Sequence, residues 1–272
     1  MTNDQWLNVF KDIGRNIHEG LPEILNKEGG KIPLGKGAGG DKTYPIDKWA
    51  EDICISFLEN VHRGGETFTL ISEELGTKSF GKGTNIVLVD PIDGSNNAKS
   101  GVPFFSTALA LLEGNTLSDL DVAYIVNLAT RDEFWAIRGE GAYKNGMRIR
   151  TSASEPLIII AYEASTPAKD IPPLMPIINQ TKRARCFGST ALDLAYLASG
   201  AVSIFATATA SRSFDYAAGM LILHEAGGIM TDFSGKSLDT VAVGVNRTAP
   251  LLASANRQLH DLALSLLARK NK

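Results

Sequence analysis

The sequence predicts a layered protein of mixed α and β structure, in which an antiparallel-rich α+β half precedes a half of α/β type. Three observations predict this fold class. Two segments with helical spacing of apolar residues precede the first strand candidate, short β-branched strands with turn signals follow to about residue 150, and strands then alternate with helices. The chain has 272 residues, 44% of them apolar, so it can bury a large core.

Two N-terminal helices are predicted over residues 1–21 and 46–61, because apolar residues recur there every three or four positions. These positions are Trp6, Val9, Phe10, Ile13 and Ile17 in the first helix and Ile46, Trp49, Ala50, Ile53 and Phe57 in the second. The stretch between the helices, "KEGGKIPLGKGAGGDKTY" (27–44), is rich in glycine and favours no regular structure. We expect a mobile loop there.

Two apolar, β-branched strand candidates come next, and both end in carboxylates. They are "ETFTLISEEL" (66–75) and "TNIVLVDPID" (84–93). A Gly-Ser turn follows the second of them. Three further segments, 105–115, 121–132 and 133–150, have the short lengths and turn punctuation of an antiparallel meander, and "KNG" at 144–146 is a hairpin signal.

A polar, proline-bearing seam at "TSASEPL" predicts the boundary between two subdomains, 1–152 and 153–272. The second subdomain alternates between the two kinds of element. Its predicted strands are 157–164, 202–208, 228–233 and 249–255, and its predicted helices are 189–200, 213–228 and 256–270.

Charge and cysteine content exclude several classes of protein. The net charge is −3 and basic residues are scattered, so neither nucleic acid nor an anionic membrane is indicated as a partner. The two cysteines lie far apart without CxxC spacing, and the four histidines lack metal-ligand spacing. The N-terminus does not resemble a signal peptide, and no segment has the length of apolar sequence that a membrane span needs. We therefore expect a cytoplasmic protein.

Carboxylates gather at the ends of apolar elements in three places. Glu73 follows the first strand, Asp90 and Asp93 close the second in "DPIDGS", and Asp215 begins a helix in "FDYAAG". Several carboxylates close together repel one another unless a cation neutralises them, and a set of oxygen ligands suits Mg²⁺. The Gly-Ser pair after Asp93 leads into a helical start, which can offer free N–H groups to a phosphate. The sequence therefore predicts adjoining metal and phosphate sites.

These motifs resemble the inositol monophosphatase family of Mg²⁺-dependent, lithium-sensitive sugar phosphatases. The resemblance rests on "EE" before "LVDPIDGS" and on the later "FDYAAG" with its Gly-Gly helix end, and it covers nearly the whole chain. It implies the αβαβα sandwich of the sugar phosphatase fold, two or three Mg²⁺ ions per site, inhibition by Li⁺ and a homodimer.

The resemblance also implies a set of site residues. The metal ligands would be Glu73, Asp90, Asp93, Asp215 and the carbonyl of Ile92. The phosphate would contact Asp93, Gly94 and Ser95. The catalytic residues would be Asp47, Glu73 and Ser95: Ser95 with Asp47 would orient the attacking water, and Glu73 with a metal would hold it. In-line attack without a covalent intermediate would follow.

Within the family, "GAGGDKTYPIDKWAEDI" and the arginine before "SFDYAAG" resemble the archaeal-type branch, which hydrolyses fructose 1,6-bisphosphate and inositol 1-phosphate. A bisphosphate needs an additional cation for its second phosphate, and Arg185 and Arg212 are the candidates. Ser189 and Thr190 are candidates for contacts with sugar hydroxyls. The chain departs from the family pattern at Asn96-Asn97 and at "FATATAS", which leaves the preferred substrate open.

Other interpretations stay open at this point. Asp90 and Asp93 suit a simple turn, Glu74 suits a solvated strand end, and the glycine-rich stretch with Lys36 and Asp41 suits either a linker or a lid over a metal. Among functions, the alternatives are a phosphatase of the same superfamily that acts on 3′-phosphoadenosine 5′-phosphate or histidinol phosphate, and a metal-binding scaffold without catalytic activity.

Overall fold

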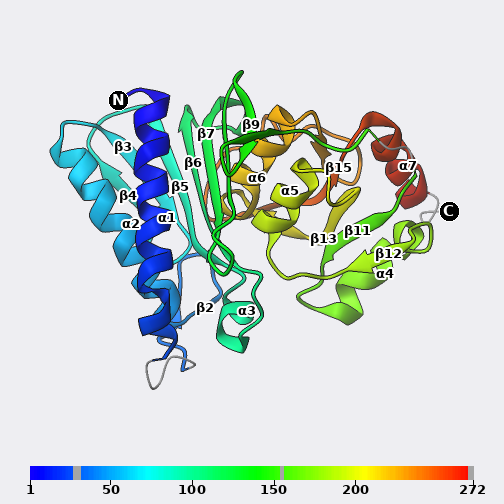
Figure 1. Cartoon of the computed structure of the whole chain (residues 1–272), viewed down its shortest axis with the longest axis horizontal. Coiled ribbons are helices and arrows are strands. Elements are labelled where there is room, and N and C mark those ends of the chain that lie inside the picture. Colours follow the sequence, from blue (N-terminus) through cyan, green and yellow to red (C-terminus); the bar gives the residue numbers. More distant parts are fainter. Residues whose placement is uncertain (27–31, 154–155, 269–272) are drawn as a thin grey trace.

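The computed structural model describes residues 1–26, 32–153 and 156–268, and two sheets form its framework (Figure 1). The strands of the larger sheet are β3 (Phe68–Ser72), β4 (Gly76–Phe80), β5 (Asn85–Asp93), β6 (Ser106–Glu113), β7 (Leu120–Asn127), β8 (Glu133–Ile137), β9 (Gly141–Lys144) and β10 (Met147–Ile149). Their order is β10-β9-β8-β7-β6-β5-β3-β4. Every neighbouring pair is antiparallel except β3 and β5, which run parallel.

The smaller sheet is mixed and comes from the C-terminal half. Its strands are β11 (Ile159–Glu163), β12 (Arg183–Arg185), β13 (Ile204–Arg212), β14 (Ile229–Thr231) and β15 (Arg247–Ser254). The order is β12-β11-β13-β15-β14; β11 runs parallel to β12 and β13, and β15 runs antiparallel to β13 and β14.

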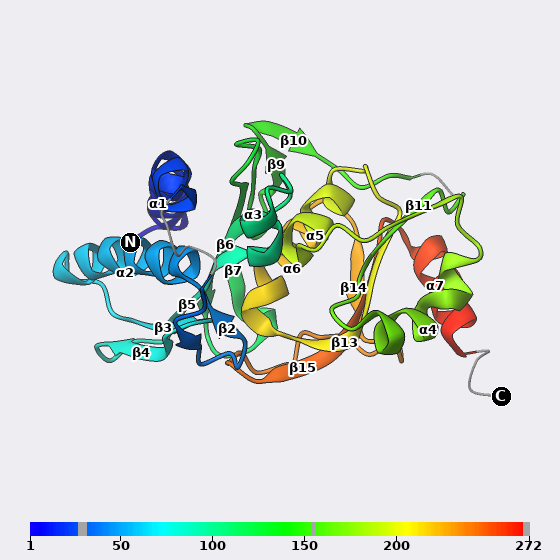
Figure 2. The ribbon, with the colours of Figure 1, turned by 90° about the horizontal axis from the view of Figure 1, so that it is seen from below.

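Helices separate and cover the two sheets. The described helices are α1 (Asn3–Leu25), α2 (Pro45–Arg63), α3 (Ser95–Ser100), the 3₁₀ turn η1 (Leu117–Asp119), α4 (Pro167–Ile178), α5 (Thr190–Ala198), α6 (Ser213–Glu225) and α7 (Arg257–Ala268). Helices α1 and α2 cover the outer face of the larger sheet, α5 and α6 lie between the sheets, and α4 and α7 cover the far face of the smaller sheet (Figures 1 and 2). These five layers are the predicted αβαβα sandwich, so the predicted fold class is confirmed.

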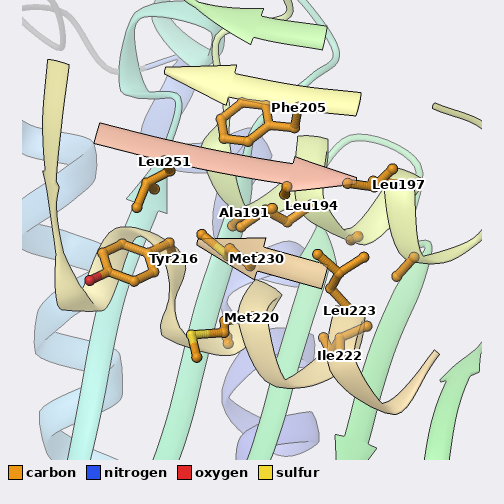
Figure 3. Close-up of a cluster of buried hydrophobic side chains, with 14 of the residues drawn as sticks. Ala191, Leu194, Leu197, Phe205, Tyr216, Met220, Ile222, Leu223, Met230 and Leu251 are labelled. Atoms are coloured by element: carbon orange, nitrogen blue, oxygen red, sulfur yellow. The ribbon is translucent and has the colours of Figure 1, made fainter. Parts of the chain in front are cut away.

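The alternation of side chains along β5 shows how the sequence builds these layers. Val87 and Val89 face α1 and α2, whereas Leu88 faces the helices between the sheets. Helix α6 is apolar on all sides because it is covered by both sheets, and Figure 3 shows Tyr216, Met220 and other side chains of this central cluster. Strands of both sheets therefore pack against α6.

The glycine-rich stretch differs from its prediction. Residues 35–36 pair with 42–43 as a short antiparallel hairpin, β1 (Gly35–Lys36) and β2 (Lys42–Thr43), so the expected absence of regular structure is wrong for this part. The hairpin closes because Gly37 N donates to the Asp41 carbonyl and the next two N–H groups donate to the carbonyls of Glu73 and Glu74. The first part of the predicted loop, 27–31, lies outside the described residues.

Besides the hairpin, β4, β12, α4 and the turn η1 were not predicted from the sequence. The boundary predicted after residue 152 falls between the last strand of the larger sheet and the first strand of the smaller, and residues 154–155 lie outside the described residues. The division into subdomains 1–152 and 153–272 stays a prediction. Among the residues that the structure describes, no helix has the length and hydropathy of a membrane span.

Candidate active site

A cavity of about 430 Å³ opens where β3 and β5 end and where α2, α3 and α6 begin. The hairpin and α3 lie at this same end of the larger sheet (Figure 1). The cavity is lined by ten of the predicted site residues: Asp47, Glu73, Asp90, Ile92, Asp93, Gly94, Ser95, Thr190, Arg212 and Asp215. Residues separated by up to 168 positions in the sequence therefore meet in one place.

The end of β5 is bent so that its two aspartates face the same cavity. Asp90 pairs with Ala108 and Asp93 pairs with Ser106, so two residues of β5 oppose the single residue Thr107. The hydroxyl of Thr107 donates to the Pro91 carbonyl over 2.8 Å and holds this bulge. Without the extra residue, side chains three positions apart on a strand would point to opposite faces.

Gly94 ends the bulge and begins α3. Its φ of +90° lies in the left-handed region, and a Cβ at this position would lie 2.9 Å from the Gly188 carbonyl oxygen. Both facts require glycine here. The turn places the N-terminus of α3 in the cavity wall, with Gly94, Ser95 and Asn96 among the lining residues.

Asp47 and Ser95 form a hydrogen-bonded pair at the cavity wall. The Ser95 hydroxyl donates to Asp47 Oδ1 over 2.6 Å, and Asp47 Oδ2 accepts from Tyr44 N over 2.8 Å at the start of α2. Burial raises the pKa of the Asp47 carboxyl, while the hydrogen bonds from Ser95 and Tyr44 lower it and leave a net increase. The side chain of Asp47 is thus held in one orientation, and both Asp47 and Ser95 line the cavity.

Arg212 lies among the carboxylates as their internal counter-charge. Its Nη2 contacts Glu73 Oε1 at 2.9 Å and Asp215 Oδ1 at 3.2 Å, while Nη1 donates to Asp41 Oδ2 at 2.8 Å and to the Gly39 carbonyl at 3.0 Å. Only 8% of the Arg212 side chain is exposed. One guanidinium therefore joins the acid cluster to the tip of the hairpin.

The acids of the cavity have pKa values raised by burial and by one another. Burial raises the pKa of Glu73 to about 8 and that of Asp93 to about 7, and the neighbouring carboxylates add to the increase. The pKa of Asp90 is also raised by burial and by Glu73 and Asp93, and its Oδ1 is buried without any hydrogen-bond partner. A buried, unpartnered carboxylate oxygen among other acids fits a divalent cation with oxygen ligands.

In the described part of the chain, however, no three acidic, histidine or cysteine side chains converge as ligands of one metal ion. Arg212 Nη2 lies between Glu73 and Asp215, two of the predicted ligands. The residue types and burial thus fit a metal site, and the guanidinium occupies part of the space between the ligands.

Asp93 also joins the two halves of the chain. Its Oδ2 accepts from the Ser189 hydroxyl over 2.5 Å and from Ala191 N over 2.8 Å at the start of α5. Ser189 is only 1% exposed and its hydroxyl oxygen also accepts from Leu192 N, so it caps α5 and orients Asp93. Ser189 is not among the residues that line the cavity, and its predicted contact with a sugar hydroxyl stays a prediction.

Arg185 is the other predicted residue that the structure does not bring to the cavity. It is exposed on the edge strand β12, and its Nη1 donates to the Ala184 carbonyl beside it. Glu74 does line the cavity, where Thr43 donates to it and burial raises its pKa to about 7. Lys36 is not among the lining residues, whereas Asp41 is.

Sequence reasoning missed several lining residues: Lys42, Tyr44, Lys99, Glu163, Ser165, Thr207, Thr209, Ser211 and Arg247. Glu163 ends an apolar strand, so it carries the same signal that identified Glu73 and Asp90. Arg247 has no local signal, because it starts a strand far from the acidic motifs in sequence.

The five-layered sandwich and its cavity of buried acids beside a Ser-Asp pair define the class of metal-dependent phosphatases. The chain belongs to the inositol monophosphatase family, whose model matches residues 7–271. This family consists of metal-dependent phosphatases, so the chain is a phosphatase by membership.

Individual relatives are similar over nearly the whole chain. A fructose-1,6-bisphosphatase/inositol-1-monophosphatase of Methanothermobacter thermautotrophicus is 32% identical and covers 96% of this chain and 96% of its own length. A bifunctional NADP phosphatase/NAD kinase of Methanococcus maripaludis is 31% identical over 97% of this chain, which corresponds to 49% of that protein. The crystal structure of an inositol monophosphatase-fructose 1,6-bisphosphatase gene product has a TM-score of 0.83 at 28% identity and covers 96% of this chain and 99% of that one.

Proposed function

We propose that the protein is a Mg²⁺-dependent phosphatase that hydrolyses small sugar or cyclitol phosphates, with fructose 1,6-bisphosphate and inositol 1-phosphate as its substrates. The observation that carries the proposal is the cluster of buried acids, including the unpartnered oxygen of Asp90, directly beside the Asp47–Ser95 pair. Relatives named for both substrates support the choice.

The metal would be held by Glu73, Asp90, Asp93, Asp215 and the Ile92 carbonyl. When bound, Mg²⁺ supplies positive charge to phosphate oxygens and lowers the pKa of water. Asp90 and Asp93 would contribute most, because both line the cavity, Asp90 is only 2% exposed, and neither lies within ion-pair distance of a cationic side chain among the described residues.

The protein's own residues provide the path for the proton of the attacking water. The Ser95 hydroxyl donates to Asp47 Oδ1, so its oxygen can accept a hydrogen bond from water in the cavity. As that water loses its proton to Ser95 Oγ, the Ser95 proton moves to Asp47 Oδ1, where burial already favours the neutral acid. Gly94, Ser95 and Asn96 at the start of α3 line the same cavity, where backbone N–H groups could bind the phosphate.

The test is phosphate release with and without Mg²⁺ from a panel of substrates. The panel contains fructose 1,6-bisphosphate, inositol 1-phosphate, NADP, 3′-phosphoadenosine 5′-phosphate and histidinol phosphate. We expect Mg²⁺-dependent release from the first two. Release from a nucleotide alone would move the function to another branch of the superfamily, and Mg²⁺ binding without any release would identify a scaffold.

A Ser95→Ala variant provides the matched control for the chemical step. It removes the hydroxyl that donates to Asp47 but leaves every predicted metal ligand in place. We expect turnover to fall about 100-fold while Mg²⁺ affinity stays within about threefold. We also propose a homodimer, a cytoplasmic location and inhibition by Li⁺, each of which rests on the resemblance or on composition.

A further inference from the structure

Among the described residues, four cationic side chains line the cavity: Lys42, Lys99, Arg212 and Arg247. Arg212 is buried in ion pairs with three carboxylates, so its charge is already balanced. The Lys99 ammonium lies over the Tyr44 ring and favours the ionised form of Asp47, which places it beside the catalytic pair. Lys42 and Arg247 are the two other lining cations.

Arg247 is held in a defined orientation. It begins β15 directly opposite Arg212 on β13, and its Nη1 donates to the Ala210 carbonyl over 2.9 Å. Its Nη2 lies 3.5 Å from Asp41 Oδ2, the same oxygen that pairs with Arg212 at 2.8 Å. The Arg247 side chain is 47% exposed. Nη1 of Arg247 is therefore anchored, whereas Nη2 has only a long contact with Asp41, a carboxylate that Arg212 already engages.

The β13 part of the cavity wall ends at Arg212, opposite Arg247, and presents hydroxyl groups, with the Glu163 carboxylate beside Thr207. Thr207, Thr209 and Ser211 follow one another along β13, and Ser165 lies in the same cavity. Thr209 donates its proton to buried Asp170, so the remaining lone pairs of its hydroxyl can accept from a ligand. A polyol with an anionic group at its far end matches hydroxyls followed by an arginine.

We propose that Arg247 binds the second anionic group of the substrate and thereby selects phosphomonoesters that carry two phosphates over those that carry one. The inference rests on the proposed function, because it assumes that the reacting phosphate lies at the Asp93–Ser95 end. Arg247 replaces Arg185, which is outside the cavity, and Arg212, whose side chain is only 8% exposed and whose Nη1 is held by Asp41 and the Gly39 carbonyl. An arginine edge forms two parallel hydrogen bonds with a phosphate, which a lysine such as Lys42 cannot do.

The kinetic test compares Arg247→Gln with Arg185→Gln, a surface arginine that serves as the matched control. For Arg247→Gln we expect kcat/KM for fructose 1,6-bisphosphate to fall about 10- to 100-fold, mainly through KM, since a charged hydrogen-bonded contact is lost. The value for inositol 1-phosphate should stay within about twofold. Arg185→Gln should change neither.

Three outcomes would overturn the proposal. They are an equal loss for both substrates, no loss for the bisphosphate, and a bisphosphate-selective loss in Arg185→Gln.

A binding measurement separates this inference from the proposed function. Both chains carry Ser95→Ala to slow turnover, and calorimetry in Mg²⁺ compares fructose 1,6-bisphosphate with fructose 6-phosphate. We expect Arg247 to provide a preference of about tenfold or more for the bisphosphate that Arg247→Gln abolishes. If the unmodified chain releases no phosphate, the proposed hydrolysis fails, yet this preference still decides the role of Arg247. Equal affinity for the two sugars in the chain that retains Arg247 would refute that role.

Discussion

Replacing Arg212 by glutamine should destabilise the metal-free protein far more than the Mg²⁺-bound protein. In the structure, this guanidinium pairs with Glu73, Asp215 and Asp41. The first two carboxylates have side chains only 15% and 13% exposed, whereas that of Asp41 is 58% exposed. Arg→Gln therefore leaves two buried acids without their counter-charge and one exposed acid almost unaffected.

The magnitude follows from these exposures. Removing one partner of a buried ion pair costs about 3–5 kcal/mol of unfolding free energy. We expect about 3 kcal/mol, the lower end, because the pKa of Glu73 is raised to about 8 and this residue can hold a proton at neutral pH. With Mg²⁺ bound, the metal supplies the missing charge and only the pair with Asp41 is lost, which is worth about 0–1 kcal/mol. The difference of about 2 kcal/mol corresponds to Mg²⁺ affinity about 30-fold higher in the variant.

Urea unfolding followed by circular dichroism, once in EDTA and once in saturating Mg²⁺, measures the loss of unfolding free energy in Arg212→Gln. Calorimetry measures the Mg²⁺ affinity. Arg185→Gln is the control, since Arg185 is exposed and its guanidinium bonds to the neighbouring Ala184 carbonyl. An equal loss of stability in EDTA and in Mg²⁺ would show that Arg212 acts by packing alone. Unchanged Mg²⁺ affinity would refute its competition with the metal.

Three further predictions concern residues that line the same cavity. Asp93→Asn should lower turnover at least about 100-fold and weaken Mg²⁺ binding. The fold should be kept, because the amide oxygen can still accept the hydrogen bond from Ala191 N at the start of α5. Near-normal turnover would show that Asp93 has no catalytic role. Gly94→Ala should cost about 2 kcal/mol or more, since φ is +90° and the Cβ would meet the Gly188 carbonyl; a loss below about 0.5 kcal/mol in urea unfolding would contradict this. In EDTA, the free energy of unfolding should fall as pH rises from about 5 to 8, because burial raises the pKa of Glu73 from 4.5 to about 8 and the native state must give up a proton that the unfolded state has already lost. Mg²⁺ affinity should rise over the same pH range. If neither the unfolding free energy nor the Mg²⁺ affinity changes with pH, the raised pKa is refuted.

Helices and strands with strong apolar periodicity were predictable from the sequence. Strands that form only because they pair with, or contact, another segment of the chain were not. The apolar face of α1, with Trp6, Phe10, Ile13 and Ile17 all buried, follows directly from spacing. Strand β4 has polar residues at its centre and exists because it pairs with β3 at the sheet edge. The hairpin β1–β2 likewise depends on contacts with the ends of β3 rather than on propensity.

Helix α4 shows a second reason for failure. Pro172, Pro173 and Pro176 lie inside it, and such residues predict a break in a helix. Burial of Leu174 and Ile177 against the smaller sheet outweighs that preference. Tertiary packing of this kind has no signature in a short window of sequence.

The residues of the candidate active site also fall into a predictable group and an unpredictable group. The acids were predictable because each one ends or begins an apolar element, which is a local pattern. The cations were not, because whether an arginine faces the cavity depends on strand register. Arg185 and Arg247 are both on strands of the smaller sheet, and only the structure shows that Arg247 lines the cavity.

The hydrogen bonds from Ser189 and Ala191 to Asp93 have a consequence for any attempt to express the halves separately. A fragment of residues 1–152 would contain Asp90 and Asp93 but would lack the groups that hold Asp93 Oδ2. A fragment of residues 153–272 would contain Ser189, Ala191 and Asp215 but would lack Asp93, the residue that Ser189 and Ala191 orient. Activity should return only when the two polypeptides are refolded together, because the active site needs residues from both fragments.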